Sequence, residues 1–399
     1  MQHLRGFFTT TSGEISVSAY FALGALSFAL TYLFTLALIK LAPRIGAVDI
    51  PDTRRIHREA VPRLGGLAIF LALALALAFA GLINQKIAAD LLTAKSIATF
   101  VGLGIMLVLG MYDDLFGASW MLKFTFQVVA ACIVIGNGLV IIKVTNPLGP
   151  TIELPVLAGL IFTVIWLVGI TNAVNLSDGL DGLASGIVLI VAGVTFANSI
   201  HLMQTRPEQY ALFVFPAITS ICLLGAAPAF LRFNFYPARI FLGDTGSLFL
   251  GFLIACSAVR SSQISTTTVA LVVPVIALGL PILDTLLAFL RRASRRRNPF
   301  QADLEHIHHK MLESGLSHPE TVLVLYGFCL LLGVAALILA LKMNQYAGII
   351  LFVLTAVTLV GFKRFGVLDV TRLWGIRKGD EDEKHKSSSS RTHTGKHAS

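Results

Sequence analysis

Charged residues are scarce in this chain of 399 residues. They make up 13% of the sequence, against about 25% in soluble globular domains, whereas hydrophobic residues make up 55%. This composition excludes an ordinary soluble domain. Several apolar runs reach about 18 to 25 residues, the length that a helix needs to cross a hydrocarbon core of roughly 30 Å. The sequence therefore predicts an all-α polytopic integral membrane protein.

Cysteine is also rare, and a secretion signal is missing. The four cysteines sit inside apolar runs without paired spacing, at Cys132, Cys222, Cys256 and Cys329. This pattern indicates small buried hydrophobic side chains and neither disulfides nor a zinc site. The first 18 residues contain no short apolar region followed by a small-residue cleavage site, so we expect no removable signal peptide. The first apolar run should remain as a membrane helix.

The charge that is present is mostly positive, with a net charge of +9. The basic residues flank the apolar runs and are not interleaved with exposed aromatic residues, so we expect membrane topology and no nucleic acid to explain them. If the N-terminus is outside, the inside segments carry 22 Lys or Arg and the outside segments carry seven. The positive-inside rule then places the C-terminus in the cytoplasm.

Hydropathy predicts about 11 transmembrane helices in one integral domain, residues 1–365. The expected spans are 17–40, 65–83, 96–111, 122–142, 155–171, 182–201, 210–230, 247–260, 268–290, 321–341 and 347–362. Residues 366–399 are charged, then rich in serine and histidine, which is typical of a largely disordered cytoplasmic tail. The sequence has no evident internal repeat.

The most distinctive stretch runs from Asn172 to Gly182 and directly follows a long apolar run. Asp178 and Asp181 within it are three residues apart, so a helix or a tight turn would place both carboxylates on one side. Two acidic groups at the mouth of a membrane helix favour a divalent cation or proton transfer. The structural alternative is a solvated helix end that terminates at glycine.

Two further acidic motifs fall on the predicted cytoplasmic side. Asp113 and Asp114 are adjacent, and on a helix they point in different directions, so one can hold a metal or substrate while a partner holds the other. Asp244 follows Gly243 and precedes Gly246, and these glycines let backbone and ligand approach closely. The alternatives are an exposed helix cap for the pair and a simple glycine turn before a helix for Asp244.

Two basic loops lie on the same side. The loop from Pro51 to Gly66 either only sets orientation or, because its prolines and glycines fix the backbone, shapes a site. The later loop has five arginines within residues 291–297, then His306 to His309. Arginines suit phosphate oxygens, whereas a zinc site would need a nearby cysteine or a second histidine pair. Asp284, about two turns inside these arginines, should pair with one of them or take part in chemistry.

In this order and on one membrane face, the motifs resemble those of the polyprenyl-phosphate N-acetylhexosamine-1-phosphate transferases. The motifs are Asp113-Asp114, Asn172 to Gly182, Asn234 to Ser247 and His306 to His309. The resemblance covers about residues 17–362. The loop from Pro51 to Gly66 and the histidine motif are more similar to the bacterial undecaprenyl-phosphate GlcNAc-1-phosphate transferases than to the MurNAc-pentapeptide enzyme. The family transfers a sugar 1-phosphate from a UDP-sugar to a polyprenyl phosphate, releases UMP and requires Mg²⁺ or Mn²⁺.

The resemblance implies a role for each motif. Asp244 would be a metal ligand, Asp113 and Asp114 would bind or deprotonate the lipid phosphate, and Asn175 and Asp178 would line the site. The remaining implied substrate contacts are Asp181, Asn234 and Phe241 at the nucleoside, with Phe241 stacked on uracil; His306, His308 and His309 at the diphosphate or sugar; and Arg55, His57 and Arg63 in the first loop. Many members have a further aspartate where this chain has Gly117, so no third carboxylate role is assigned there.

The expected reaction is transfer of GlcNAc 1-phosphate from UDP-GlcNAc to undecaprenyl phosphate, at the cytoplasmic face of the inner (plasma) membrane. Another UDP-N-acetylhexosamine or the MurNAc-pentapeptide nucleotide is the alternative donor, and the oligomeric state, a homodimer included, is left open. Direct attack is favoured over an aspartate intermediate, because a phosphomonoester with a second pKa of about 6 is mostly dianionic at neutral pH. The rival class is a transporter, whose site would lie near the midplane between inverted repeats.

Overall fold

The computed structural model describes residues 15–49, 60–144, 152–262, 278–279, 281–286 and 307–342. Several of the expectations lie outside these ranges. They are the side chains of Arg55, His57 and His306, the arginines of 291–297, most of the predicted span 268–290, the span 347–362 and the tail 366–399.

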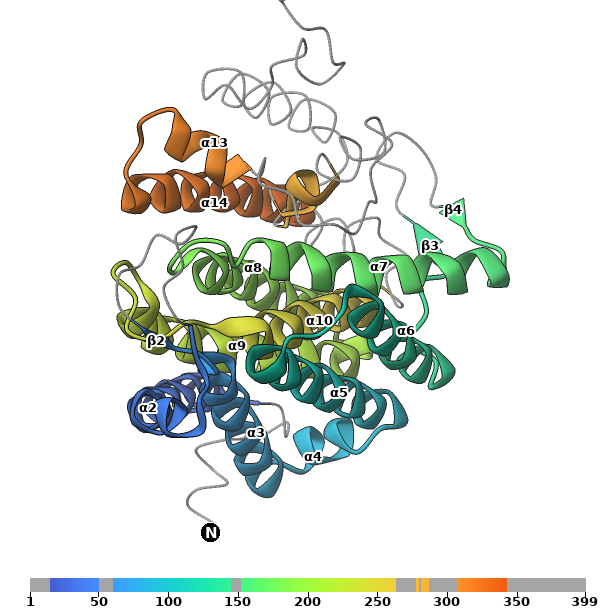
Figure 1. The fold of residues 1–399 in the computed structure, drawn as a ribbon. Helices are drawn as coiled ribbons and strands as arrows, with labels where there is room; N and C mark the ends of the chain where they lie inside the picture. Colours follow the sequence, from blue (N-terminus) through green and yellow to red (C-terminus); the bar gives the residue numbers. More distant parts are fainter. Residues whose placement is uncertain are drawn as a thin grey trace, which may run out of the picture.

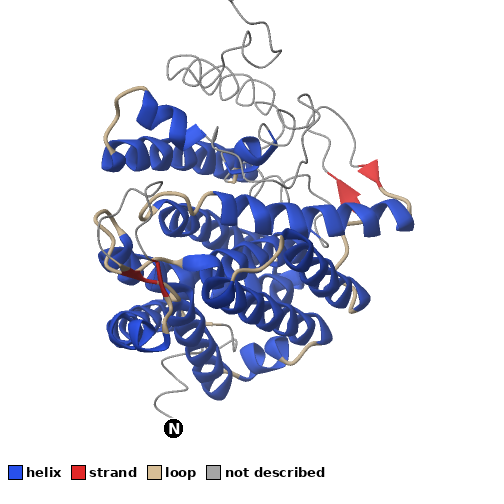
Figure 2. Cartoon of the chain, viewed as in Figure 1, coloured by secondary structure: helices blue, strands red, loops and turns tan. Residues whose placement is uncertain are grey.

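The described chain is built from helices (Figure 1). They are α2 (Val17–Leu41), α3 (Gly65–Ile83), α4 (Gln85–Leu91), α5 (Ala94–Phe116), α6 (Trp120–Gly136), α7 (Val156–Leu176), α8 (Leu183–Thr205), α9 (Tyr210–Asn234), α10 (Gly243–Ser262), α13 (Ile307–Glu313) and α14 (His318–Lys342), with the 3₁₀ turns η1 (Ala42–Ile45) and η2 (Pro207–Gln209). Two short antiparallel pairs, β1 (Val48–Asp49) with β2 (Val61–Pro62) and β3 (Lys143–Val144) with β4 (Ile152–Glu153), are the strands in Figure 2. The prediction of a helical polytopic membrane protein is confirmed.

The predicted number of spans is not confirmed. Seven of the described helical segments are long and apolar enough to cross a membrane, and they contain α2, α3, α5, α7, α8, α9 and α14. Helix α6 coincides with a predicted span but has 17 residues, and α10 carries a charged residue in each end turn, Asp244 in the first and Arg260 in the last. The remaining two predicted spans fall largely or wholly outside the described residues.

Local sequence explains where the helices begin and end. The hydroxyl oxygens of Ser16, Thr93 and Ser119 accept backbone N–H groups in the first turns of α2, α5 and α6. Such N-caps satisfy donors that have no intrahelical partner. Helix α5 ends at Gly117, whose φ of +74° is a backbone conformation that suits glycine. The acidic pair therefore lies in the last turn of α5, inside the helix.

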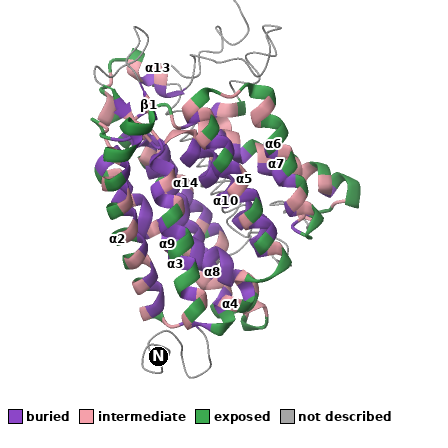
Figure 3. Cartoon of the chain, turned by 60° about the horizontal axis from the view of Figure 1, so that its bottom comes forward, coloured by how far each residue is buried: buried purple, intermediate pink, exposed green. Residues whose placement is uncertain are grey.

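Helix α10 is the centre of the bundle and packs against α3, α5, α7, α8 and α9. Its large side chains Phe249 and Phe252 are almost fully buried, whereas Phe21 of α2 and Val156 of α7 are 72% and 73% exposed. Figure 3 shows exposed residues along outer helices such as α2. An apolar exterior around a buried centre is the arrangement expected where lipid covers the outside. The chain is an integral membrane protein, and α10 is held between the surrounding helices.

Candidate functional site

Asp114 caps the N-terminus of α10. The two oxygens of its buried carboxylate accept the backbone N–H groups of Asp244 and Thr245, each at 3.0 Å, and the Thr245 hydroxyl at 2.7 Å. The first N–H groups of a helix lack intrahelical partners, and a carboxylate also suits the positive end of the helix dipole. Asp114 therefore positions Asp244, although the resemblance placed it at the lipid phosphate.

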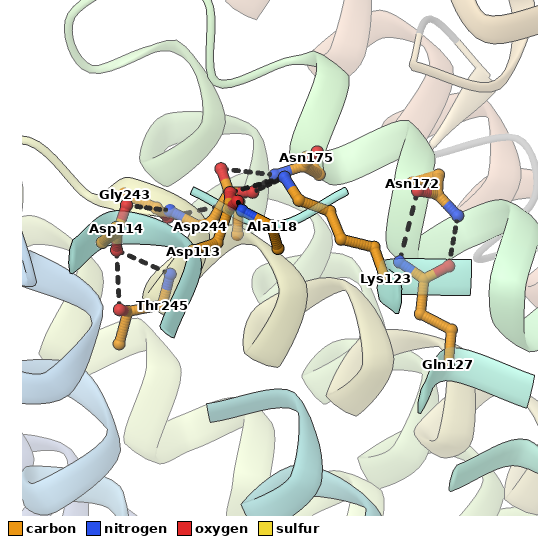
Figure 4. A network of polar contacts seen from close by, with 11 residues as sticks. Asp113, Asp114, Ala118, Lys123, Gln127, Asn172, Asn175, Gly243, Asp244 and Thr245 are labelled. Atoms are coloured by element: carbon orange, nitrogen blue, oxygen red, sulfur yellow. Dashed lines mark hydrogen bonds and ion pairs between the residues drawn. The ribbon is translucent and has the colours of Figure 1, made fainter. Parts of the chain in front are cut away.

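Asp113 points the other way and joins a charged network (Figure 4). One carboxylate oxygen accepts the Ala118 N–H at 2.5 Å, and the other lies 2.5 Å from the Lys123 Nζ. The same ammonium group pairs with Asp244. The two adjacent aspartates therefore have different partners, and a metal or substrate at either of them stays a prediction.

Asn175 completes this network from the last turn of α7. Its Nδ2 donates to Asp244 Oδ1 at 3.1 Å and to the Ser247 hydroxyl at 2.8 Å. The sequence reading had placed residues 172–181 in a loop, but α7 continues to Leu176 and holds the Asn175 amide at the start of α10. Three helices, α5, α7 and α10, and Lys123 from α6 therefore meet at Asp244.

Lys123 was not predicted as a site residue, although the sequence carried a signal for it. It stands at the edge of the predicted span 122–142 among apolar residues, and a charged residue within a membrane segment suggests function by default. Gln127, one turn further along α6, was also missed. It exchanges hydrogen bonds with Asn172, at 2.7 Å and 3.3 Å, and so ties α6 to α7 beside the network.

Asp178 lies in the turn between α7 and α8, close to the same negative charges. Burial raises its pKa well above the usual range, and the charges of Asp244, Asp114 and Asp181 raise the pKa further. The Asp178 carboxyl group therefore retains a proton more readily than an isolated aspartate would. The negative charges around it favour the approach of a cation.

Asp181 connects that turn to two other segments. Its Oδ2 accepts the Ala238 N–H at 2.9 Å, and its own N–H donates to Nε2 of His318 at 3.3 Å. The His318 ring stacks on Tyr236, with centroids 4.6 Å apart. His318, at the first residue of α14, was not predicted, because only the fold brings it to the turn.

Asn234 uses its side chain inside the protein. Its Oδ1 accepts the Ser185 hydroxyl at 2.7 Å and its Nδ2 donates to the Ile240 carbonyl at 3.0 Å. The residue is 2% exposed. It holds the loop that leads to Phe241, whose backbone is bonded to Pro62 and Gly65 at 2.8 and 3.0 Å. In this structure Asn234 positions the loop that carries Phe241, and the nucleoside contact that the resemblance implies stays a prediction.

These elements surround a cavity of about 1010 Å³, large enough for a drug-sized ligand or larger. Of the predicted site residues, its lining includes Arg63, Asp114, Asp178, Asp181, Asn234, Phe241, Asp244 and His309. His318 and Tyr236, which were not predicted, line it as well. Asp113 and Asn175 are not among the lining residues. They are connected to the cavity through Asp244, which Asn175 contacts directly and Asp113 contacts through Lys123.

Of the predicted site residues, the first loop and the histidine motif each contribute one described residue to the lining. Arg63 lies next to β2 and pairs with Asp49 at 2.5 Å, which holds its guanidinium at the cavity wall. His309 lines the cavity, whereas His308 is buried. A Cβ at Gly179 would lie 2.6 Å from the His308 Nε2, so the histidine packs directly on the backbone beside Asp178.

The carboxylate oxygens of this network fit a divalent cation whose remaining coordination positions are filled by substrate. Asp113 and Asp244 direct carboxylate oxygens at one cation, the Lys123 ammonium. Within the described residues no three His, Cys, Asp or Glu side chains are grouped to hold a metal. Mg²⁺ is commonly held by one or two carboxylates, waters and substrate phosphates, so a complete protein cage is not required.

A close contact between α5 and α10 gives a first testable prediction. A Cβ at Gly110 would lie 2.5 Å from the Thr245 backbone nitrogen, so Gly110→Ala must push the helices apart. We expect it to cost about 1–3 kcal/mol of stability and to lower the midpoint of thermal unfolding in detergent. Gly104→Ala in the same helix is the matched control, because a Cβ there meets nothing within 4 Å. Equal melting of the two variants would contradict this packing.

The sequence was compared with known proteins. The family described as glycosyl transferase family 4 matches residues 96–262. A Bacillus subtilis protein named probable undecaprenyl-phosphate N-acetylglucosaminyl 1-phosphate transferase is 36% identical over 82% of this chain and 86% of its own length. A Mycolicibacterium smegmatis protein named decaprenyl-phosphate N-acetylglucosaminephosphotransferase is 36% identical over 74% and 76%.

A Thermotoga maritima protein named undecaprenyl-phosphate alpha-N-acetylglucosaminyl 1-phosphate transferase is 28% identical over 77% of this chain and 87% of its own length. The family match contains Asp113, Asp178 and Asp244, so it covers the acidic centre of the network described above. The two relatives at 36% identity extend over most of the chain. This chain therefore belongs to glycosyl transferase family 4.

Proposed function

We propose that this protein transfers GlcNAc 1-phosphate from UDP-GlcNAc to undecaprenyl phosphate, releases UMP and so begins a lipid-linked cell-envelope polysaccharide. The observation that carries the proposal is the convergence of four separate motifs on one acidic network and its adjoining cavity. The names of the relatives support a GlcNAc 1-phosphate donor and a polyprenyl phosphate acceptor.

The chain's own residues can perform the work that this reaction needs. Attack of one phosphate on another requires positioning and neutralisation of charge more than covalent assistance. Lys123 supplies a positive charge beside Asp113 and Asp244. Arg63 and His309 stand at the cavity wall, where phosphate oxygens of the donor would bind. Asp113, with one oxygen directed at Lys123, is the base that would accept a proton from the lipid phosphate.

A divalent cation, Mg²⁺ or Mn²⁺, would be held by Asp244. When bound, it would neutralise charge on the diphosphate of the donor. Asn175 orients Asp244 through its hydrogen bond to Oδ1, and Asp114 fixes the backbone of the same residue. These two residues therefore set the direction in which the Asp244 carboxylate would face a cation.

Transfer of radiolabel from a UDP-sugar into butanol-extractable lipid tests the proposal. Purified protein in detergent would receive undecaprenyl phosphate, Mg²⁺ and one of three donors: UDP-GlcNAc, UDP-GalNAc or the MurNAc-pentapeptide nucleotide. We expect labelled lipid with UDP-GlcNAc and release of UMP. Transfer from the pentapeptide nucleotide alone would replace the proposed specificity, and no transfer from any donor would refute the activity.

We also propose that the cavity faces the cytoplasm and that the membrane is the plasma membrane. The basic residues favour this side, since the inside segments carry 22 Lys or Arg against seven outside. In a cysteine-free background, we expect Glu313→Cys, near the histidines, to react with an impermeant maleimide only after the cells are opened. Asn137→Cys, at the far end of α6, should react in intact cells. Both residues are exposed, and the reverse pattern would overturn the orientation.

A further inference from the structure

Asp284 makes a buried connection to the start of α13. Its carboxylate is 7% exposed, and Oδ1 accepts the backbone N–H of Ile307 at 3.0 Å. Ile307 is the first residue of α13, whose first N–H groups have no intrahelical partner. A carboxylate at this position both satisfies a donor and suits the helix dipole. The bond therefore ties Ile307 of α13 to Asp284.

Helix α13 carries two histidines of the motif to the cavity. The His308 and His309 rings lie 4.3 Å apart, His308 packs on Gly179 beside Asp178, and His309 lines the main cavity. Asp284 and His308 also line a second cavity of about 20 Å³, which has room for about one water molecule. A displacement of α13 would thus move both histidines and disturb the packing of the turn that holds Asp178.

We propose that Asp284 is a positioning residue for the sugar-nucleotide donor. By holding Ile307 it anchors α13, and through α13 it keeps His308 against Gly179 and His309 in the cavity. The sequence predicts for Asp284 an ion pair with a loop arginine or a part in the chemistry, and those arginines lie outside the described residues. The hydrogen bond to Ile307 connects Asp284 to the histidine helix. This inference rests on the proposed transferase function, because the donor is what His309 would meet in the cavity.

Steady-state kinetics of Asp284 variants test the inference. Asp284→Ala removes the acceptor, and we expect the KM for UDP-GlcNAc to rise at least tenfold while kcat and the KM for undecaprenyl phosphate change less than threefold. Asp284→Asn keeps an oxygen that can accept the Ile307 N–H and should recover most of the loss. If Asp284→Ala does not fold, Asp284→Ser is used in its place. The serine side chain is shorter than that of aspartate and does not reach the Ile307 N–H.

Glu320→Ala is the matched control. The Glu320 carboxylate accepts the Ser317 N–H at 2.8 Å at the start of α14, so it makes the same kind of bond on the exposed surface. We expect its loss to leave the KM for UDP-GlcNAc unchanged. A rise equal to that of Asp284→Ala would show that any lost helix cap has this effect, and it would overturn the inference.

A double-mutant cycle separates positioning from plain stability. If Asp284 acts through α13, Asp284→Ala should add little to the KM increase caused by His309→Ala, because both remove the same contact. Additive effects, or an unchanged KM in Asp284→Ala, would overturn the inference while leaving the transferase function intact. Absence of transfer by the unmodified chain would instead refute the proposed function on which the inference rests.

Discussion

Asp244→Asn is expected to lower transfer at least about 10³-fold, equivalent to about 4 kcal/mol, at every Mg²⁺ concentration. Asp244 is where the network converges: Lys123 pairs with its Oδ2, Asn175 donates to its Oδ1 and Asp114 accepts its backbone N–H. Asparagine has nearly the same shape but no charge. The substitution therefore removes a ligand from the proposed cation site and leaves one negative charge fewer around Lys123.

The fold should survive this change, because the hydrogen bond from the residue 244 backbone to Asp114 does not involve the side chain. The measurements are turnover with UDP-GlcNAc, Mn²⁺ affinity by electron paramagnetic resonance and thermal unfolding in detergent. Glu153→Gln is the control, since it neutralises an exposed carboxylate paired with Lys143 far along the chain. Near-normal turnover in Asp244→Asn, or unchanged Mn²⁺ affinity, would remove Asp244 from the cation site.

The sequence predicted the acidic centre because its signals are local. Carboxylates and amides that directly follow apolar runs stand out against a chain with few charges, and glycines beside Asp244 mark a place where backbones meet. Gly66 marks another such place: a Cβ there would overlap the Gly246 backbone, so α3 and α10 are in contact beside Asp244. Local chemistry therefore identified which residues matter at this end of the helices.

The partners of those residues could not be predicted in the same way. Hydropathy measures polarity, so it ended two spans at their first polar residues, although α5 continues through Asp113 to Phe116 and α7 through Asn175 to Leu176. Asp114 reads as a candidate for chemistry in the sequence, but the bond to the α10 backbone depends on residues 130 positions away. His318 and Asp181 are 137 positions apart, and only the packing of α14 on α8 brings them together.

The structure also bears on the transporter alternative. Ion-coupled transporters typically place their sites near the middle of the membrane, between repeats with broken helices. Here Asp113 lies in the last turn of α5, Asn175 in the last turn of α7 and Asp244 in the first turn of α10, so the polar groups meet at helix ends. Helix ends at one face suit a reaction between a water-soluble nucleotide and a lipid head group.

The pH dependence of Asp113→Asn distinguishes direct attack from a covalent intermediate. If Asp113 acts as a base, the variant should lose more than about 100-fold at pH 6, where much of the lipid phosphate, with a second pKa of about 6, carries a proton. The loss should shrink by pH 8.5, because the phosphate is then ionised without help. If Asp113 formed a phosphoaspartate, no pH would restore the variant, since asparagine cannot replace the nucleophile.

The quantity to measure is the ratio of variant to parent turnover between pH 6 and pH 8.5, at saturating lipid and Mg²⁺. Asp114→Asn provides the contrast: its carboxylate holds the Asp244 and Thr245 backbone, so we expect a loss that does not vary with pH in this range. Because Mg²⁺ and basic groups lower the pKa of a bound phosphate, the rise for Asp113→Asn should begin below the pH that the free phosphate would suggest. A flat, very low ratio for Asp113→Asn would count against direct attack, whereas a rising ratio beside a flat one for Asp114→Asn would assign the proton transfer to Asp113.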